Sequence, residues 1–236
     1  MESTEAERRA RREFAELVGV GGEIPLDRAA FLLSAALGGH VIDVAEQSRR
    51  LDDLAAGVRE STVEAVAEHL FGGPGGFVGD RNDYRNPDNS RLDRVLDRRR
   101  GIPISLSVLM IEVARRCDVR LVGVGMPGHF LVGVPGATGR VRSFVDAFDG
   151  GRALDVDGCR DLMRSMAGPG VGFDERWLAP THSMAIIERM TNNLKAIHLA
   201  TGDVASLRKV MTLRSAIPGL GRAESDEFAR AMAILN

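Results

Sequence analysis

The stretch GIPISLSVLMIEVARRCDV, residues 101–119, constrains the fold more than any other part of the sequence. Pro103 suits the first turn of a helix, where the missing N–H of proline costs no hydrogen bond. From residue 102 to residue 114 the segment is apolar almost all round. A helix without a polar face is buried inside a protein. The rest of the domain must therefore cover this helix on all sides.

After this helix the hydrophobic pattern changes from helical to strand-like. Three short runs rich in β-formers follow at Leu121–Met126, His129–Val134 and Val141–Phe148, separated by glycine and proline. Short runs of this kind predict an antiparallel sheet. We therefore expect an α+β fold in which a buried central helix packs against a small antiparallel sheet.

The remainder of the chain has the spacing of amphipathic helices. Helical patterns precede the central segment, and from about residue 182 the chain is helical to its end, with breaks at Thr201–Asp203 and Pro218–Gly219. The predicted division is a charged N-terminal segment at 1–22, a main domain at 23–178 and a helical tail at 179–236. The apolar positions of the tail predict that it packs on the main domain.

Composition and charge narrow the possible partners. The formal net charge of −2 gives no global attraction to nucleic acid or to an anionic membrane, so neither partner is expected. No apolar run approaches the ~20 residues of a membrane span, and the N-terminus lacks the apolar core of a signal peptide. Two cysteines are too few for a disulfide scaffold or a structural zinc site. The sequence predicts a cytoplasmic protein with no metal and no cofactor.

His129 and Asp146 are the strongest candidates for chemistry. If residues 135–140 form the loop of a hairpin, Val134 lies opposite Val141, and His129 then lies directly opposite Asp146 on the same face. A carboxylate beside an imidazole orients the ring and stabilises its charged form, as acid–base catalysis requires. The alternatives are a buried pair with a structural role, or a shifted register that separates the two residues.

A nucleophile would complete the constellation, and the sequence does not supply an obvious one. The N-terminus of a buried helix stabilises an anion, but the only nucleophilic side chains near it are Ser105 and Ser107. Cys117 follows 103 by 14 residues, roughly 21 Å along a helix axis. Cys159 lies beyond the strands, where packing as a small hydrophobe is the default role.

Several motifs resemble one bacterial family. GIPISLSVLMIEVARR, GVGMPGHFLVGV and FVDAFDGGRAL are similar to segments of the SirB-one proteins, members of the transglutaminase-like superfamily, as are DYRNPDNSRLDRVLDRR and NNLKAIHLATGD. The resemblance spans roughly residues 25–215. It implies a papain-like core and a C-terminal tail that resembles tetratricopeptide helices.

The resemblance also implies a site. In catalytic members of the superfamily a Gly-x-Cys turn opens the central helix, a histidine follows on a strand and an aspartate lies on the next strand. Gly101-Ile102 corresponds to that turn, and Pro103 or a neighbour occupies the cysteine's place. His129 and Asp146 correspond to the histidine and the aspartate. The family resemblance thus implies an acid–base pair without a cysteine nucleophile.

Three functions are compatible with these residues. The preferred one is a non-catalytic transglutaminase-like protein with a binding or regulatory role, whose helical tail contacts a protein or peptide. The alternative is a hydrolase or acyltransferase that uses Ser105, His129 and Asp146, so the enzyme assignment stays open. A third is nucleic-acid binding by the arginines of residues 91–100, but Asp93 and Asp97 interleave with them and favour a solvated helix face.

Overall fold

The structure is a computed structural model that describes residues 2–137, 139–168 and 170–221. The chain divides into two compact units, each built from separate stretches of sequence. The first contains residues 1–48, 85–97 and 183–236, and the second contains residues 49–84 and 98–182. The predicted boundaries at 22 and 178 stay a prediction, and residues 222–236 of the predicted tail lie outside the described residues.

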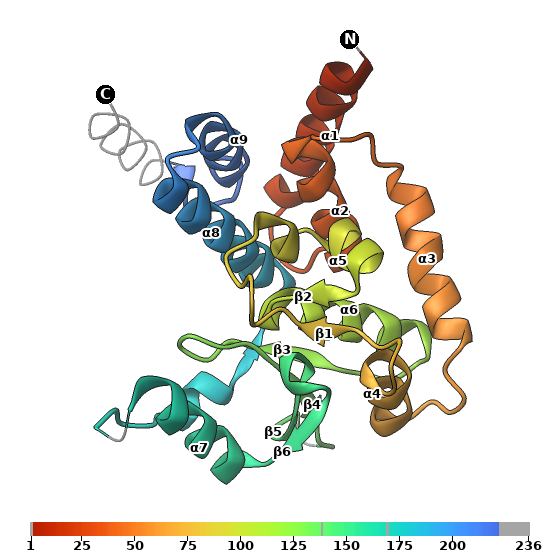
Figure 1. Ribbon diagram of the computed structural model, residues 1–236, viewed down its shortest axis with the longest axis vertical. Helices are drawn as coiled ribbons and strands as arrows, with labels where there is room; N and C mark the ends of the chain where they lie inside the picture. Colours follow the sequence, from red (N-terminus) through yellow and green to blue (C-terminus); the bar gives the residue numbers. More distant parts are fainter. Residues whose placement is uncertain (1, 138, 169, 222–236) are drawn as a thin grey trace. The chain divides into compact units, whose positions relative to one another are not determined.

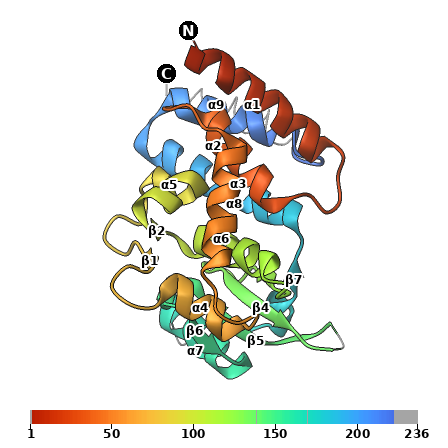
Figure 2. The ribbon, with the colours of Figure 1, turned by 90° about the vertical axis from the view of Figure 1, so that its right-hand side faces the viewer.

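The first unit is helical (Figure 1). Its helices are α1 (Glu2–Gly19), α2 (Leu26–Leu37), the first turn of α3 (Val44–Ala56), η1 (Pro87–Ser90), α5 (Leu92–Arg98, of which only Arg98 falls in the second unit), α8 (Ser183–Thr201) and α9 (Val204–Arg214). Helix α2 is buried along most of its length and contacts α1, α8 and α9 (Figure 2). The C-terminal helices therefore pack on the N-terminal ones.

Polar contacts join the two ends of the chain within this unit. The Ser183 hydroxyl accepts the Ile24 N–H at 2.7 Å and donates to the Glu23 carboxylate at 2.8 Å. Lys209, on α9, donates to the Glu7 carboxylate and to the Leu37 carbonyl, both at 2.9 Å. The ammonium group of Lys209 thus satisfies a carbonyl at the C-terminal end of α2, where the helix dipole favours a positive charge.

The second unit combines helices with sheets. Its elements are α4 (Val63–Phe71), β1 (Val78–Gly79), β2 (Arg100–Gly101), α6 (Pro103–Arg116), β3 (Val122–Val124), β4 (Leu131–Pro135), β5 (Val141–Asp146), η2 (Ala147–Asp149), β6 (Arg152–Leu154), α7 (Val156–Ala167), η3 (Glu175–Leu178) and β7 (Pro180–Thr181). The mixture of helices with a small antiparallel sheet confirms the α+β class.

Five short strands form the main sheet of this unit, in the order β6-β5-β4-β3-β7, and all neighbouring strands are antiparallel. Helix α6 contacts β3, β4, α4 and η2, and its residues from Pro103 to Ala114 are all buried. Apolar residues of β3, β4, β5 and α7 form a further core on this sheet: Val124, Leu131, Phe144, Cys159 and Met163. The sheet therefore lies next to the buried helix that the sequence predicts.

Among the described residues, no helix is both long enough and apolar enough to cross a membrane. The same residues contain no group of three or more His, Cys, Asp or Glu side chains that could hold a metal ion.

Leu194 and Leu199 give a matched test of how α8 is anchored. Leu194 is fully buried, whereas Leu199 on the same helix is 43% exposed. We expect Leu194→Ala to lower the free energy of unfolding by about 2–5 kcal/mol, because it leaves a cavity. Leu199→Ala should change it by no more than about 0.5 kcal/mol. Urea denaturation measures both values, and equal effects would contradict the packing of α8.

His198 makes the stability of the first unit depend on pH. Burial lowers the pKa of His198 below its ordinary value of 6.5, although the nearby Asp203 carboxylate, 3.4 Å away, acts in the opposite direction. The fold therefore favours neutral His198, and this stability is present above pH 6.5 and lost as the pH falls below it. Between pH 7.5 and 5.5, we expect the unfolding free energy of wild type to fall more steeply than that of His198→Gln. Equal slopes for the two proteins would contradict a pH dependence that arises from His198.

Candidate functional site

His129 and Asp146 are in direct contact inside the second unit. The Nε2 atom of His129 lies 3.0 Å from both carboxylate oxygens of Asp146. The histidine is 6% exposed and the aspartate 1% exposed. A buried imidazole whose nitrogen faces a carboxylate has a fixed orientation. The contact predicted from the sequence is therefore present, and its catalytic role stays a prediction.

The strands reach this contact in a register different from the predicted one. Val134 pairs with Ser143 rather than with Val141, and Val141 pairs with Pro135 after an irregularity between Val134 and Pro135. His129 itself lies just before β4, and Asp146 is the last residue of β5. Strand side chains alternate between faces with a period of two, so a shift by two residues keeps each residue on its face. The pair survives the wrong register because diagonal neighbours are still within reach of long side chains.

Asp146 also shapes the turn that follows β5. Its Oδ1 atom accepts the N–H groups of Phe148 at 3.1 Å and Asp149 at 3.2 Å, and so caps η2. Gly150 and Gly151 then adopt left-handed backbone with φ of 67° and 77°, a region that favours glycine. One carboxylate thus holds His129 and starts the turn that positions Phe148.

The aromatic ring of Phe148 packs against the imidazole of His129. Its ring meets His129 edge to face, with centroids 6.2 Å apart and planes at 79°. On its other sides it contacts Tyr84 at 5.9 Å between centroids and the Arg81 guanidinium at 4.9 Å. The sequence does not predict Arg81 and Tyr84 as neighbours of this site. They lie in a stretch of turn-forming residues whose composition predicts irregular backbone but no tertiary neighbour.

The N-terminus of α6 holds the position that the family resemblance assigns to a nucleophile. Pro103 is the first residue of the helix. The Ser105 hydroxyl accepts the Ile102 N–H and donates to the Ile102 carbonyl, both at 3.1 Å. Ser105 has no exposed surface, and neither has Ser107, whose hydroxyl lies 3.5 Å from the Phe130 carbonyl. Ser105 therefore stabilises the start of the helix.

The two cysteines lie away from this position. Cys117 is the C-terminal cap of α6, with its Sγ atom 3.6 Å from the Ala55 carbonyl oxygen. Cys159 is on α7, and burial, followed by the negative charges of Asp155 and Asp146, raises the pKa of its thiol to about 12. Both thiols are free of disulfide bonds.

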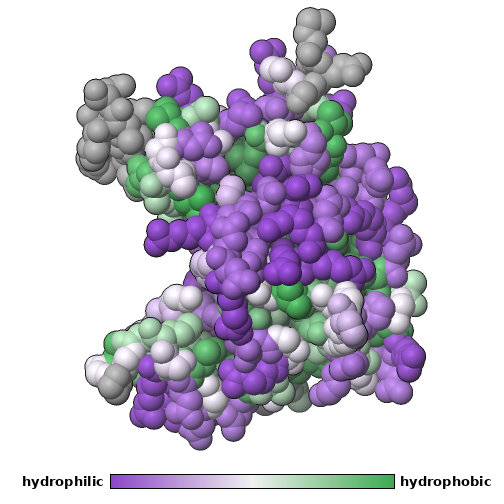
Figure 3. Space-filling view, in the orientation of Figure 1, coloured by the Kyte–Doolittle hydropathy of each residue, from purple (hydrophilic) through white to green (hydrophobic). Residues whose placement is uncertain are grey.

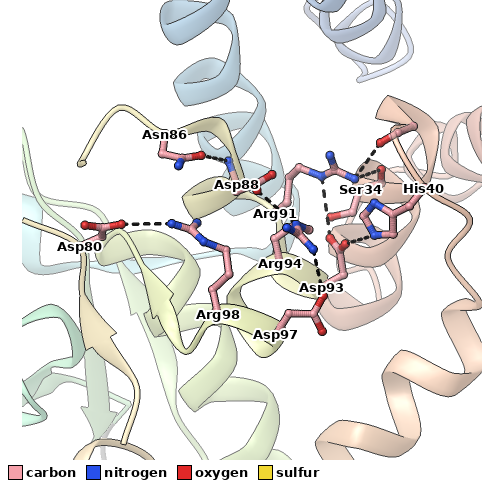
Figure 4. Close-up of polar contacts among 11 residues, drawn as sticks. Ser34, His40, Asp80, Asn86, Asp88, Arg91, Asp93, Arg94, Asp97 and Arg98 are labelled. Atoms are coloured by element: carbon pink, nitrogen blue, oxygen red, sulfur yellow. Dashed lines mark hydrogen bonds and ion pairs between the residues drawn. The ribbon is translucent and has the colours of Figure 1, made fainter. Parts of the chain in front are cut away.

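The arginine-rich segment from residue 86 to residue 98 is held by its own polar contacts (Figure 4). Arg91 donates to the Ser34 and Gly38 carbonyls at the end of α2, at 3.3 and 2.9 Å, and Asp93 lies 2.8 Å from His40. Arg94 binds the carboxylates of Asp88 and Asp97, both at 3.2 Å. Hydrophilic residues gather on the face over α5 (Figure 3). Intramolecular partners thus account for most of these guanidinium groups.

Comparison with known proteins identifies the family. The sequence profile described as the transglutaminase-like superfamily matches residues 40–192, more than half of the chain. The chain belongs to the transglutaminase-like superfamily. The matched region includes α6, His129 and Asp146, and it begins within the first unit.

The individual proteins that this chain resembles include UPF0162 proteins and a SirB1 protein. A UPF0162 protein of Xylella fastidiosa is 42% identical over 141 residues, 58% of this chain and 49% of the relative. Protein SirB1 of Salmonella typhimurium is 27% identical over 127 residues, 54% of this chain and 46% of the relative. Human F-box only protein 21 is 34% identical over 139 residues, 56% of this chain and 20% of the relative.

The relatives confirm the resemblance to the SirB-one proteins, and the matched part spans about half the length of these bacterial relatives. No solved structure matches the chain.

A comparison of Asp146 with Asp155 separates the stability that the His129 contact contributes from the stability that helix capping contributes. Both side chains cap a helix, but Asp155 is exposed, and its carboxylate accepts the Gly158 N–H at 2.8 Å. We expect Asp155→Ala to cost about 1 kcal/mol of unfolding free energy. Asp146→Ala should cost about 3 kcal/mol, because it also leaves buried His129 without its carboxylate partner. Equal losses in urea denaturation would show that the His129 contact adds no stability.

Proposed function

We propose that this protein is a non-catalytic member of the transglutaminase-like superfamily that acts by binding a protein or peptide. The papain-like arrangement that we propose for its core is supported by the contacts of α6 with β3, β4 and η2, the turn that follows β5. The superfamily chemistry requires a nucleophile at the start of that helix, and the proposal depends on what this chain has there.

The observation that carries the proposal is the chemistry at the start of α6. Proline at 103 has no ionisable or nucleophilic group. The neighbouring Ser105 hydroxyl is fully buried and already makes two hydrogen bonds to Ile102. A hydroxyl attacks an acyl carbon only when a base takes its proton and the substrate can reach it. Ser105 lacks the exposure that this reaction needs.

The thiols support the same conclusion. A reactive cysteine has a lowered pKa and partial exposure, whereas the pKa of Cys159 is raised to about 12 and that of Cys117 is also raised, in both cases mainly by burial. Free thiols are typical of a reducing compartment, which supports the proposed cytoplasmic location.

The helical tail is the partner surface that we propose from its resemblance to tetratricopeptide helices. The apolar side of α8, with Ile187, Met190 and Leu194, is buried within its own unit and is not free to bind. A partner would therefore contact the outward side of α8, where Leu199 is 43% exposed. Nucleic acid is a poorer candidate because Arg91, Arg94 and Arg98 already bind groups of the protein.

A serine hydrolase is the second candidate, and the His129–Asp146 contact is the observation that favours it. A histidine held by a carboxylate is the base half of a catalytic triad. With Ser105 as nucleophile, the chain order would be Ser105, His129, Asp146. This function requires the start of α6 to rearrange so that Ser105 becomes accessible.

Active-site probes separate the two functions. We expect a fluorophosphonate, which captures activated serines, to leave Ser105 unlabelled, because the hydroxyl is buried and bonded to Ile102. We expect iodoacetamide to modify Cys159 at least tenfold more slowly than a free thiol at pH 8, because almost none of it is ionised. Mass spectrometry of peptides measures both reactions.

One result would establish the hydrolase instead. Stoichiometric labelling of Ser105 that disappears in His129→Ala, but persists in the exposed-histidine variant His182→Ala, would show a serine activated by His129. That outcome would refute the non-catalytic proposal.

A further inference from the structure

Asp149 joins two arginines on the surface of the second unit. Its Oδ1 atom accepts Nη2–H of Arg81 at 2.7 Å, and its Oδ2 atom accepts Nε–H of Arg152 at 2.8 Å. Each oxygen of one carboxylate thus binds a different guanidinium. Two positive charges share one negative charge, which leaves one formal positive charge uncompensated within this group.

The two guanidinium groups are held in place by the fold. Asp149 belongs to η2, whose first turn is capped by Asp146. The guanidinium of Arg81 also lies over the ring of Phe148, 4.9 Å from its centroid, and that ring is 9% exposed. Because these side chains are already ordered, the binding of a ligand costs less conformational entropy.

Both arginines keep hydrogen-bond donors for a ligand. An arginine has five N–H donors, and in the described part of the chain the contact with Asp149 is the only side-chain hydrogen bond or ion pair of either arginine. The side chains of Arg81 and Arg152 are 62% and 49% exposed. Exposed ion pairs contribute little to stability, so a ligand can engage these guanidinium groups at little cost to the fold.

An exposed aromatic residue lies beside these donors. Tyr84 is 45% exposed and packs edge to face on Phe148, the ring that also carries Arg81. A ligand bound to the arginines can therefore place an apolar group against Tyr84. Phe148 links this surface to His129, 6.2 Å away between ring centroids.

We propose that Arg81 and Arg152 bind a carboxylate of a peptide ligand, with an adjacent apolar side chain against Tyr84. Guanidinium groups recognise carboxylates through paired N–H···O bonds. The single uncompensated charge balances a carboxylate, whereas a phosphate dianion would leave excess negative charge beside Asp149. This inference rests on the proposed peptide-binding function and names the ligand chemistry of its site.

Tyr84 provides the readout because it is the only tyrosine in the chain. Protein labelled with 3-fluorotyrosine gives one ¹⁹F NMR signal, which is titrated with N-acetylphenylalanine. We expect a saturable shift. The uncharged N-acetylphenylalaninamide should bind at least about tenfold more weakly, because it lacks the carboxylate.

Substitutions locate the carboxylate. Arg81→Ala and Arg152→Ala should each weaken binding of N-acetylphenylalanine by about tenfold. Arg176→Ala is the matched control, because Arg176 is an arginine of the same unit whose side chain is 90% exposed and bound to Asp174. It should leave the affinity unchanged. Circular dichroism of each variant confirms that the fold is intact.

The remaining titrations decide the source of the carboxylate. Tighter binding of N-acetylphenylalanine than of N-acetylglutamylphenylalaninamide assigns the site to a C-terminus, and the reverse order assigns it to an acidic side chain. Tighter binding of inorganic phosphate than of either ligand, or no saturable shift with either, would refute the inference. Neither result affects the labelling test of Ser105, so failure here is distinct from failure of the non-catalytic proposal.

Discussion

The burial of α6 is the constraint from which the second unit is built. Its residues from Pro103 to Ala114 have no solvent-facing side, so β3, β4, α4 and η2 must all pack against it. Each polar group on the helix then needs an internal partner, since an unsatisfied buried hydroxyl or carboxylate is costly. Glu112 meets this need through Arg115 and Arg116, both within 3.0 Å. The hydroxyls at the other end of the helix meet it through backbone groups.

A structural role of Asp146 accounts for the His129–Asp146 contact without a cysteine nucleophile. Asp146 caps the turn after β5 in addition to binding His129. Loss of the carboxylate would therefore disturb the fold whether or not the protein is a catalyst. A triad-like geometry is in this case weak support for catalysis, because Ser105 and Asp146 each have a structural role.

The sequence predicted the parts of the fold whose signal is local. The helix over 103–116 follows from an almost unbroken apolar segment, and three of the strands follow from short runs rich in β-formers. Strands β1, β2, β6 and β7 were missed because each has only two or three residues and none lies in a longer run of β-formers. The register predicted for β4 and β5 was wrong because the irregularity between Val134 and Pro135 depends on the geometry of the loop, which the sequence does not reveal. The Arg81–Asp149–Arg152 group left no signal, since its members are separated in sequence and meet only in the tertiary structure.

The hairpin of β4 and β5 implies a rule for length variation among related chains. Because the two faces of a strand alternate, the gain or loss of a single residue inside β5, between Phe144 and Asp146, would turn one of these two side chains to the opposite face unless a bulge absorbs it. A residue inserted between Pro135 and Val141 lengthens the loop and leaves the pairing of the strands as it is. Related hairpins should therefore differ in length in the loop rather than inside the strands.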